Sequence, residues 1–420
     1  MGILSVAELM PDMVLAEDVK NPQGRFILAK GKILASNDIR ILKMWGIVEA
    51  HVEGVSREDV DEKGNVSLDP EIIKVAENII IPRFRHADLK NPVIKELLRL
   101  SSLVKAEEMS SPEYREGKGS HGGEKQGIEP DQEKIPATTH LDPNELIHDE
   151  INLPTLPAIY EELTEHINNP RSSAKDIGNV ICKDVSFSAR LLKLVNSVFY
   201  GFPSKIDSLS RAVTIVGFKQ LSNLVMGISV INAFKGIPSD IIDMKSFWEH
   251  SLACGIIARI LAGYVKIQNT ERLFVGGLLH DVGRLLLCSV KPLHVKEIIL
   301  KARLSEKLLY RVEPQMIGFD HATLGGILLK KWRLPVSVES IVKNHHTPME
   351  AKDPVEPAIA HLADIMANAL GKGCSGEQFI PPLNVSAWES IELSINSLGL
   401  TIKQMNRQIE EISRHLFNDE

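Results

Sequence analysis

The stretch Leu278-Leu279-His280-Asp281-Val282-Gly283 places a histidine and an aspartate in the middle of an apolar run. Burying two polar side chains there costs on the order of several kcal/mol unless they are paired or bound. The apolar spacing of residues 271–287 predicts one continuous helix around the pair. Neighbours on a helix point about 100° apart, so one metal ion reaches both side chains only if the aspartate bridges or the helix ends there.

The sequence around this stretch predicts a mainly α-helical fold. Between residues 141 and 420, apolar residues recur at helical spacing, as in Leu191-Leu192-Val195, and most connections are short, as expected for packed helices. The predicted helices cover residues 159–167, 174–182, 187–196, 206–216, 219–234, 247–264, 271–287, 293–302, 305–318, 321–332, 336–344, 355–370, 385–397 and 402–417.

Two regions precede the helical domain predicted at residues 141–420. Residues 107–140 have almost no aliphatic side chains and are rich in Gly, Glu, Lys, Ser and Pro. Such a segment cannot bury enough surface to offset its ordering entropy, which predicts a flexible charged linker. Residues 1–106 predict a small α+β module with trailing helices. Its predicted elements are strands at 26–29 and 48–52 and helices at 39–45, 70–80 and 92–105.

Composition narrows the classes of function. The 420 residues include 48 Lys and Arg against 55 Asp and Glu, a net charge of −7, so no basic excess exists for general nucleic-acid binding. The best candidate for a membrane span in the sequence, residues 251–265, is too short to cross a bilayer and contains Arg259. The first residues lack the features of a secretory signal, and the four cysteines form no CxxC pair. We therefore expect a cytoplasmic protein without membrane attachment.

Histidines and aspartates recur along the helical domain in or beside predicted helices. Imidazole and carboxylate groups suit Fe, Mn, Zn or Ni as ligands. A lone histidine on an apolar helix is more often a core or capping residue, and the pair His148-Asp149, which lies outside any predicted helix, is attributed to chance. The joint order of the others favours a site. Its members are His250, His280, Asp281, His321, His345, His346 and Asp364.

These residues resemble a known superfamily. His250, His280-Asp281 and Asp364 resemble the H…HD…D signature of HD-type metal-dependent phosphohydrolases. His321 and His345-His346 resemble the additional histidines with which the HD-GYP subset holds a second metal. The closer resemblance is to the HDOD family, a helical regulatory relative, over roughly residues 145–400. Its motifs here are Leu153–Pro157, Asp184 with Leu191–Ser197, Ala212–Gly217, His280–Gly283, Glu313–Gly325, Trp332–Pro335 and His345-His346. Residues 8–53 more loosely resemble the module preceding some HD-GYP domains.

Two departures from the HD-GYP pattern bear on activity. The GYP element after the paired histidines is absent, because the chain continues Thr347-Pro348-Met349-Glu350. The lysine three residues after the HD aspartate is replaced by Arg284, which grips phosphate as a planar fork rather than a point charge. The resemblance therefore implies metal binding more strongly than hydrolysis of cyclic di-GMP.

The resemblance also implies roles for the residues. A binuclear site would have Asp281 as the bridging carboxylate, and the metal would be Fe or Mn, with Zn or Ni still open. Arg284 would hold a phosphate in the same pocket or be a surface or helix-end charge. His361 would orient a ligand or only pack. One metal would be completed by His250, His280 and Asp364, and the other by His321, His345 and His346.

Three classes of function follow. The first is a signalling or regulatory protein in which the HDOD domain binds a nucleotide second messenger or a partner protein. The second is a metal-dependent phosphodiesterase acting on a cyclic dinucleotide or another phosphoester, with Asp281 and Arg284 in catalytic roles. The third is a structural interaction scaffold with an empty histidine cluster. The motifs favour the first class.

Overall fold

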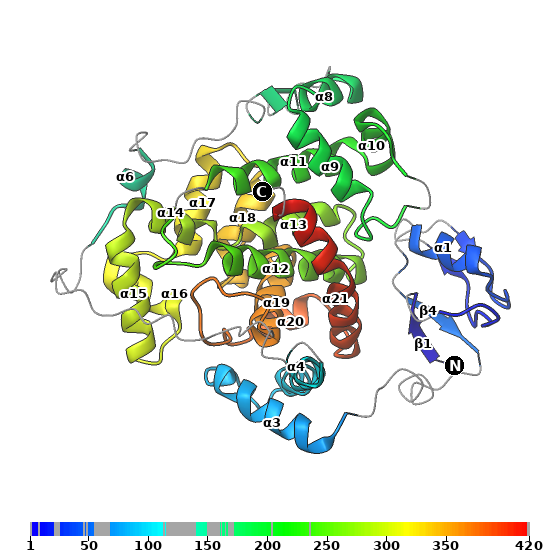
Figure 1. The fold of residues 1–420 in the computed structure, drawn as a ribbon, viewed down its shortest axis with the longest axis horizontal. Coiled ribbons are helices and arrows are strands. Elements are labelled where there is room, and N and C mark those ends of the chain that lie inside the picture. The colour runs from blue at the N-terminus through cyan, green and yellow to red at the C-terminus, as the bar shows by residue number, and fades with distance from the viewer. Residues whose placement is uncertain are drawn as a thin grey trace.

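The computed structural model confirms a mainly helical fold, with strands only in the N-terminal part of the described chain (Figure 1). The predicted linker and the motif Leu153–Pro157 fall largely outside the described residues. The structure describes residues 2–6, 9–20, 26–44, 47, 49–53, 68–111, 114, 140–148, 160, 162–163, 165–166, 172–202, 205–234 and 237–417.

The described residues of the N-terminal module form two short antiparallel strand pairs and one helix. Strand β1 (Gly2–Ser5) pairs with β4 (Glu49–Val52), and β2 (Val19–Lys20) pairs with β3 (Phe26–Leu28). Helix α1 spans Ser36–Met44. The strands predicted at 26–29 and 48–52 correspond to β3 and β4, and their partners were not predicted. Buried side chains form a small core of Leu4, Val6, Leu9, Leu15, Val19, Leu34, Ile39, Leu42, Ala50 and Val52.

Two helices follow the module at the positions that their capping residues predict. Helix α3 (Pro70–Ile80) begins after Asp69, whose carboxylate accepts a hydrogen bond from the backbone N–H of Glu71. A short 3₁₀ turn, η1 (Ile81–Phe84), ends it where the sequence has Pro82. Helix α4 (Pro92–Ser110) starts after Asn91 in the same way. Asp and Asn at these positions satisfy backbone donors of the first turn, which explains why both starts were predictable.

Helix α4 packs against α19 (Val355–Leu370), a helix of the C-terminal part. The apolar side chains that α3, η1 and α4 bury join the core of that part rather than the core of the N-terminal module. These are Ile80, Phe84, Val93, Ile94 and Leu97. The domain boundary at residue 106 stays a prediction, and this shared core groups α4 with the helices that follow.

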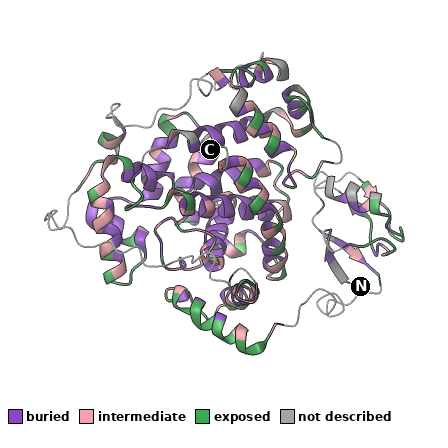
Figure 2. Ribbon diagram, in the orientation of Figure 1, coloured by how far each residue is buried: buried purple, intermediate pink, exposed green. Residues whose placement is uncertain are grey.

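The C-terminal part is a packed array of helices with its buried residues concentrated at the centre (Figure 2). Its helices are α6 (Pro143–His148), α8 (Ala174–Ile181), α9 (Val185–Val195), α10 (Leu209–Val216), α11 (Phe218–Ala233), α12 (Met244–Tyr264), α13 (Thr270–Leu279), α14 (Val282–Val290), α15 (Pro292–Leu304), α16 (Leu309–Ile317), α17 (His321–Lys331), α18 (Val336–Asn344), η2 (Pro348–Glu350), α19, α20 (Val385–Ser390) and α21 (Asn396–Phe417).

Helices α12 and α13 pack so closely that their backbones are in contact. A Cβ added to Gly277 would lie 2.8 Å from the Cα of Gly255 and 2.9 Å from the carbonyl oxygen of Cys254. Only glycine leaves room for this contact, because any other side chain would overlap the facing backbone. The close approach places the site residues of the two helices beside one another.

The continuous helix predicted over residues 271–287 is wrong. Helix α13 ends at Leu279 and α14 begins at Val282, with Asp281 at φ −98° and ψ 10° between them. The break lets α14 meet α17, where Gly283 lies against the backbone of His321. The apolar pattern runs on through the break, so it carried no signal of the turn. The histidine and the aspartate therefore lie at a helix end, one of the two arrangements that the sequence allowed.

The residues 270–290 that span this break are long and apolar enough to cross a membrane by length and composition. In the structure, 89% of the most apolar window is buried inside the protein. The apolar character of the segment is thus accounted for by its place in the helical core.

Candidate metal centre

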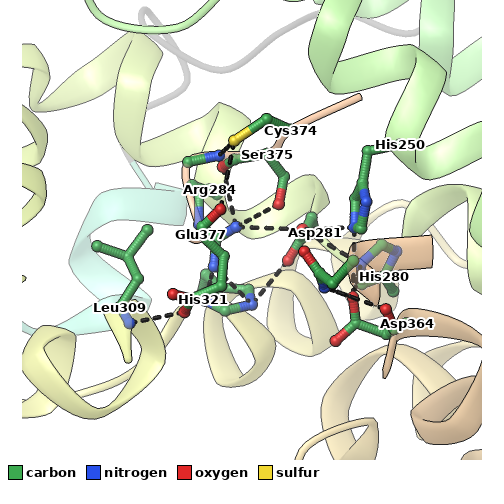
Figure 3. A network of polar contacts seen from close by, with 12 residues as sticks. His250, His280, Asp281, Arg284, Leu309, His321, Asp364, Cys374, Ser375 and Glu377 are labelled. Carbon is green, nitrogen blue, oxygen red and sulfur yellow. Dashed lines mark hydrogen bonds and ion pairs between the residues drawn. The ribbon is translucent and has the colours of Figure 1, made fainter. Parts of the chain in front are cut away.

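Six ligand candidates from the sequence are enclosed at one place in the helical part, with the seventh at its margin (Figure 3 shows most of them). Most lie at helix ends, where the backbone turns and the side chains can converge from several directions. They are His250 on α12, His280 and Asp281 between α13 and α14, His321 at the start of α17, His345 and His346 after α18, and Asp364 on α19.

The first group of ligand atoms joins α12, the α13–α14 turn and α19. His250 Nε2 lies 3.3 Å from Asp364 Oδ1 and 3.9 Å from Asp281 Oδ2. His280 Nε2 lies 3.2 Å from Asp281 Oδ2 and 3.5 Å from Asp364 Oδ1. Two imidazoles and two carboxylates thus converge, which is a donor set suited to a first-row divalent metal.

The second group lies on the other side of Asp281. His321 Nε2 is 2.8 Å from Asp281 Oδ1 and 3.2 Å from His346 Nε2. The rings of His345 and His346 lie 3.9 Å apart by their centroids. Asp281 therefore directs one oxygen to each group, and its role as a bridging ligand stays a prediction.

Three of the imidazoles are held by their Nδ1 atoms. The Nδ1 atoms of His280 and His345 each lie 2.7 Å from the backbone oxygen three residues earlier, and Nδ1 of His321 lies 2.6 Å from Glu313 Oε2. A proton on Nδ1 leaves the Nε2 lone pair free, as in metal sites whose second shell orients the ligands. The Nε2 atoms of His250, His280 and His345 are buried without a hydrogen-bond partner among the described residues. These orphaned acceptors fit a bound cation.

The protonation states of the two aspartates and of His345 fit metal ligands, whereas carboxylates beside His280 and His321 outweigh burial and raise the pKa of both imidazoles, to about 9 for His321. Burial raises the pKa of the Asp281 carboxyl, but Arg284 and the neighbouring imidazoles outweigh it and hold that pKa well below its usual range. The pKa of Asp364 is likewise held well below its usual range, because the nearby imidazoles of His250 and His280 outweigh burial. Burial, with the neighbouring imidazoles, lowers the pKa of His345 to about 3. Ionised carboxylates and a neutral imidazole are the forms that bind metal.

Arg284 is buried beside the site, which excludes a surface charge. Its Nη1 lies 3.1 Å from Asp281 Oδ2 and donates to the carbonyl and hydroxyl oxygens of Ser375, at 2.9 and 2.8 Å. Its Nη2 lies 3.0 Å from His321 Nδ1, and its Nε lies 3.5 Å from Glu313 Oε1. The contacts are shown in Figure 3. Protein groups surround the whole guanidinium, and its predicted phosphate role stays a prediction.

Two residues that position the ligands, Glu313 and Asn368, were not predicted, whereas the sequence left the role of His361 open between orienting a ligand and packing. Glu313 lies inside a quoted motif, but nothing in the sequence assigned it to His321. Asn368 follows Asp364 by one helical turn and donates to its Oδ1 at 2.7 Å, a spacing that could have revealed it. His361 Nδ1 lies 2.8 Å from the backbone oxygen of His345, and its Nε2 accepts from the backbone N–H of residue 384. His361 therefore holds the backbone that carries a ligand.

The loop that supplies Ser375 also carries a buried carboxyl group, Glu377. Its oxygens accept hydrogen bonds from the backbone N–H groups of Leu309, Gln378 and Phe379. Burial outweighs these contacts and Arg284, and raises the pKa of Glu377 from 4.5 to about 7. The carboxyl thus joins the loop to the start of α16 and is partly neutral near pH 7.

This raised pKa predicts a pH-dependent stability. A carboxyl whose pKa is higher in the folded than in the unfolded state contributes fully below its unfolded value, and the contribution is lost as pH rises through the folded value. We expect ionisation of Glu377 to lower the free energy of unfolding by about 3 kcal/mol as the pH rises from roughly 4.5 to 7.5. Urea unfolding across this range should show a flatter profile for Glu377→Gln than for the original chain. Equal slopes in the two proteins would contradict the assignment.

Comparison with known proteins agrees with the helical fold. Residues 153–348 match the family described as HDOD domain. A protein of Treponema pallidum (strain Nichols) described as uncharacterized is 29% identical over 219 residues, covering 50% of this chain and 41% of that protein. The chain thus spans about two fifths of the length of this curated relative.

Two solved structures share the fold. One is an HDOD domain protein with unknown function from Geobacter sulfurreducens, at TM-score 0.53 and 22% identity, covering 65% of this chain and 95% of the other. The second is a candidate phosphohydrolase from Shewanella amazonensis SB2B, at TM-score 0.52 and 23% identity, covering 64% of this chain and 97% of the other. At these identities the likeness extends to the fold alone.

Proposed function

We propose that this chain, whose residues 153–348 match the HDOD domain family, is a cytoplasmic signalling protein with a metal-binding regulatory domain. One observation carries the proposal: the imidazole and carboxylate groups converge in an enclosed centre. Six of the seven candidate ligands expose 3% or less of their surface, and the seventh, His346, is half-buried under the ring of Tyr310 at 4.0 Å. An enclosed centre suits an ion that holds helices together better than one that receives a substrate.

The bound ion is proposed to be Fe or Mn, which suit mixed imidazole and carboxylate donors. When bound, it would supply positive charge to the buried carboxylates of Asp281 and Asp364 and accept the free Nε2 lone pairs. The protein groups are already ordered for this task, because the Nδ1 atoms of His280 and His345 are fixed. The ion would then join α12, α13, α18 and α19.

The partner is proposed to be a nucleotide second messenger or a signalling protein, with the N-terminal module transmitting the state of the helical part. The net charge of −7 supports neither direct nucleic-acid binding nor attraction to an anionic membrane surface. Both kinds of partner belong in a binding screen of the full chain.

A second candidate function, a metal-dependent phosphodiesterase, is favoured by the complete ligand set. Asp281 directs one oxygen to each of two ligand groups. In hydrolases a pair of metals with such a carboxylate lowers the pKa of water to about 7 and polarises a phosphoryl oxygen. Here Arg284, the residue that would hold the phosphate, is engaged by Asp281 and Ser375.

The two proposed functions predict different results in a phosphodiester hydrolysis assay. The full chain, supplied with Mn²⁺ or Fe²⁺, should be assayed with cyclic di-GMP and with bis(4-nitrophenyl) phosphate, beside Asp281→Asn as the matched control. The regulatory proposal expects no hydrolysis above the level of that variant. Metal-dependent turnover that Asp281→Asn abolishes would contradict it and establish the phosphodiesterase.

A further inference from the structure

We infer that the centre holds a single divalent ion, bound by His250, His280, His345, Asp281 and Asp364. Arg284 and His321 occupy the side of Asp281 where the HD-GYP resemblance would place a second ion. The inference rests on the proposed function only in requiring that the centre binds metal. It changes the role of His345, from a ligand of a separate second ion to a ligand of the first.

The partners of the Nε2 atoms separate the histidines into two kinds. Among the described residues, the buried Nε2 atoms of His250, His280 and His345 have no hydrogen-bond partner, and neither does Nδ1 of His250 or of His346. The Nε2 atoms of His321 and His346 face each other at 3.2 Å, and that of His321 also faces Asp281. The three unpartnered Nε2 atoms therefore mark where we place the cation.

These three histidines belong to ligand groups that share His280. One potential group contains His250, His280 and Asp364, and another contains His280, Asp281 and His345, with the atoms of each group within 4.8 Å of one another. The rings of His280 and His345 lie 5.0 Å apart by their centroids. A third group, with His321 and His346, also includes His345. His345 can therefore be a ligand in either group, but its single free lone pair can bind only one ion.

Both nitrogens of His321 already face carboxylates. Its Nε2 lies 2.8 Å from Asp281 and its Nδ1 lies 2.6 Å from Glu313. The guanidinium of Arg284 lies against the same ring, with Nη2 at 3.0 and 3.2 Å from the two nitrogens. Ser375 holds that guanidinium through two hydrogen bonds, so it cannot leave without breaking them. A permanent cation thus contacts two of the residues that a second ion would need.

The first test is the number of ions per chain. The full chain is loaded with Mn²⁺, desalted, and analysed for metal and protein, with titration calorimetry as a second measure of the stoichiometry. We expect about one ion per chain. Two ions per chain would overturn this inference and leave the proposed function standing, whereas no bound ion would overturn both.

The second test uses adjacent histidines as a matched pair. His346→Ala should retain about one ion per chain with little change in affinity, because His346 lies outside the site. His345→Ala should weaken Mn²⁺ binding by about tenfold or more, because it removes a ligand, and even second-shell changes cost 10–100-fold. Circular dichroism checks that each variant is folded. A loss of metal in His346→Ala that matches the loss in His345→Ala would overturn the inference.

Discussion

Replacement of Gly283 by alanine is expected to destabilise the protein by about 3 kcal/mol or more, at or beyond the upper end of the usual cost of overpacking. A Cβ at this position would lie 2.0 Å from the backbone oxygen of His321 and 2.6 Å from the backbone nitrogen of Gly325. Neither atom belongs to a side chain that could rotate away. Helices α14 and α17 would have to separate, and urea unfolding of the purified variant measures the loss.

Gly399→Ala is the control for this prediction. Gly399 lies within α21, and its added Cβ would meet the side chain of Leu100 at 3.5 Å, an ordinary contact. Alanine is favoured over glycine in a helix interior, so stability should be unchanged or rise by up to about 1 kcal/mol. If Gly283→Ala unfolded at the same urea concentration as Gly399→Ala, the close contact of α14 with α17 would be wrong.

Asp281→Asn is expected to weaken Mn²⁺ binding by about 100-fold or more. The carboxylate is central to the site, because its oxygens lie 3.2 Å from His280 Nε2, 2.8 Å from His321 Nε2 and 3.1 Å from Arg284 Nη1. Asparagine keeps the shape but removes the charge, so Arg284 loses a buried partner as well. Breaking a buried ion pair costs about 3–5 kcal/mol, so a lower melting temperature should accompany the loss of metal.

Metal analysis after desalting, together with thermal unfolding with and without Mn²⁺, measures both effects. Asp353→Asn is the matched control, because Asp353 is exposed. It should retain the metal content and the Mn²⁺-dependent rise in melting temperature of the original chain. Full metal retention in Asp281→Asn would contradict the assignment of Asp281 as a ligand.

Local features of the sequence predicted local structure well. Asp69-Pro70 marked the start of α3, and the apolar spacing of residues 355–370 gave the bounds of α19. Where the same spacing continued through a turn, it failed. The helix predicted over 385–397 is divided between α20, which ends at Ser390, and α21, which begins at Asn396. Helical periodicity reports which residues face the core, and a turn between two buried segments leaves it unchanged.

The resemblance to the HD signature was enough to name the candidate ligands that the fold brings together, but their supporting contacts could not be predicted. Arg284 meets Glu313 across 29 positions and Ser375 across 91. Such pairs depend on how α14, α16 and the loop after α19 pack together. Local patterns in a single sequence do not reveal contacts between residues so far apart. The role of His361 was open for the same reason, since it required the position of the His345 backbone.

The contact between Gly255 and Gly277 has a kinetic consequence for any ion held at this centre. These glycines bring α12 and α13 into backbone contact close to His250 and His280, so the spacing of the two imidazoles is set by main chain rather than by adjustable side chains. An enclosed ion with ligands fixed in this way can leave only when the helices part. Its residence time should therefore follow the rate of local opening, which amide hydrogen exchange in α12 and α13 would report.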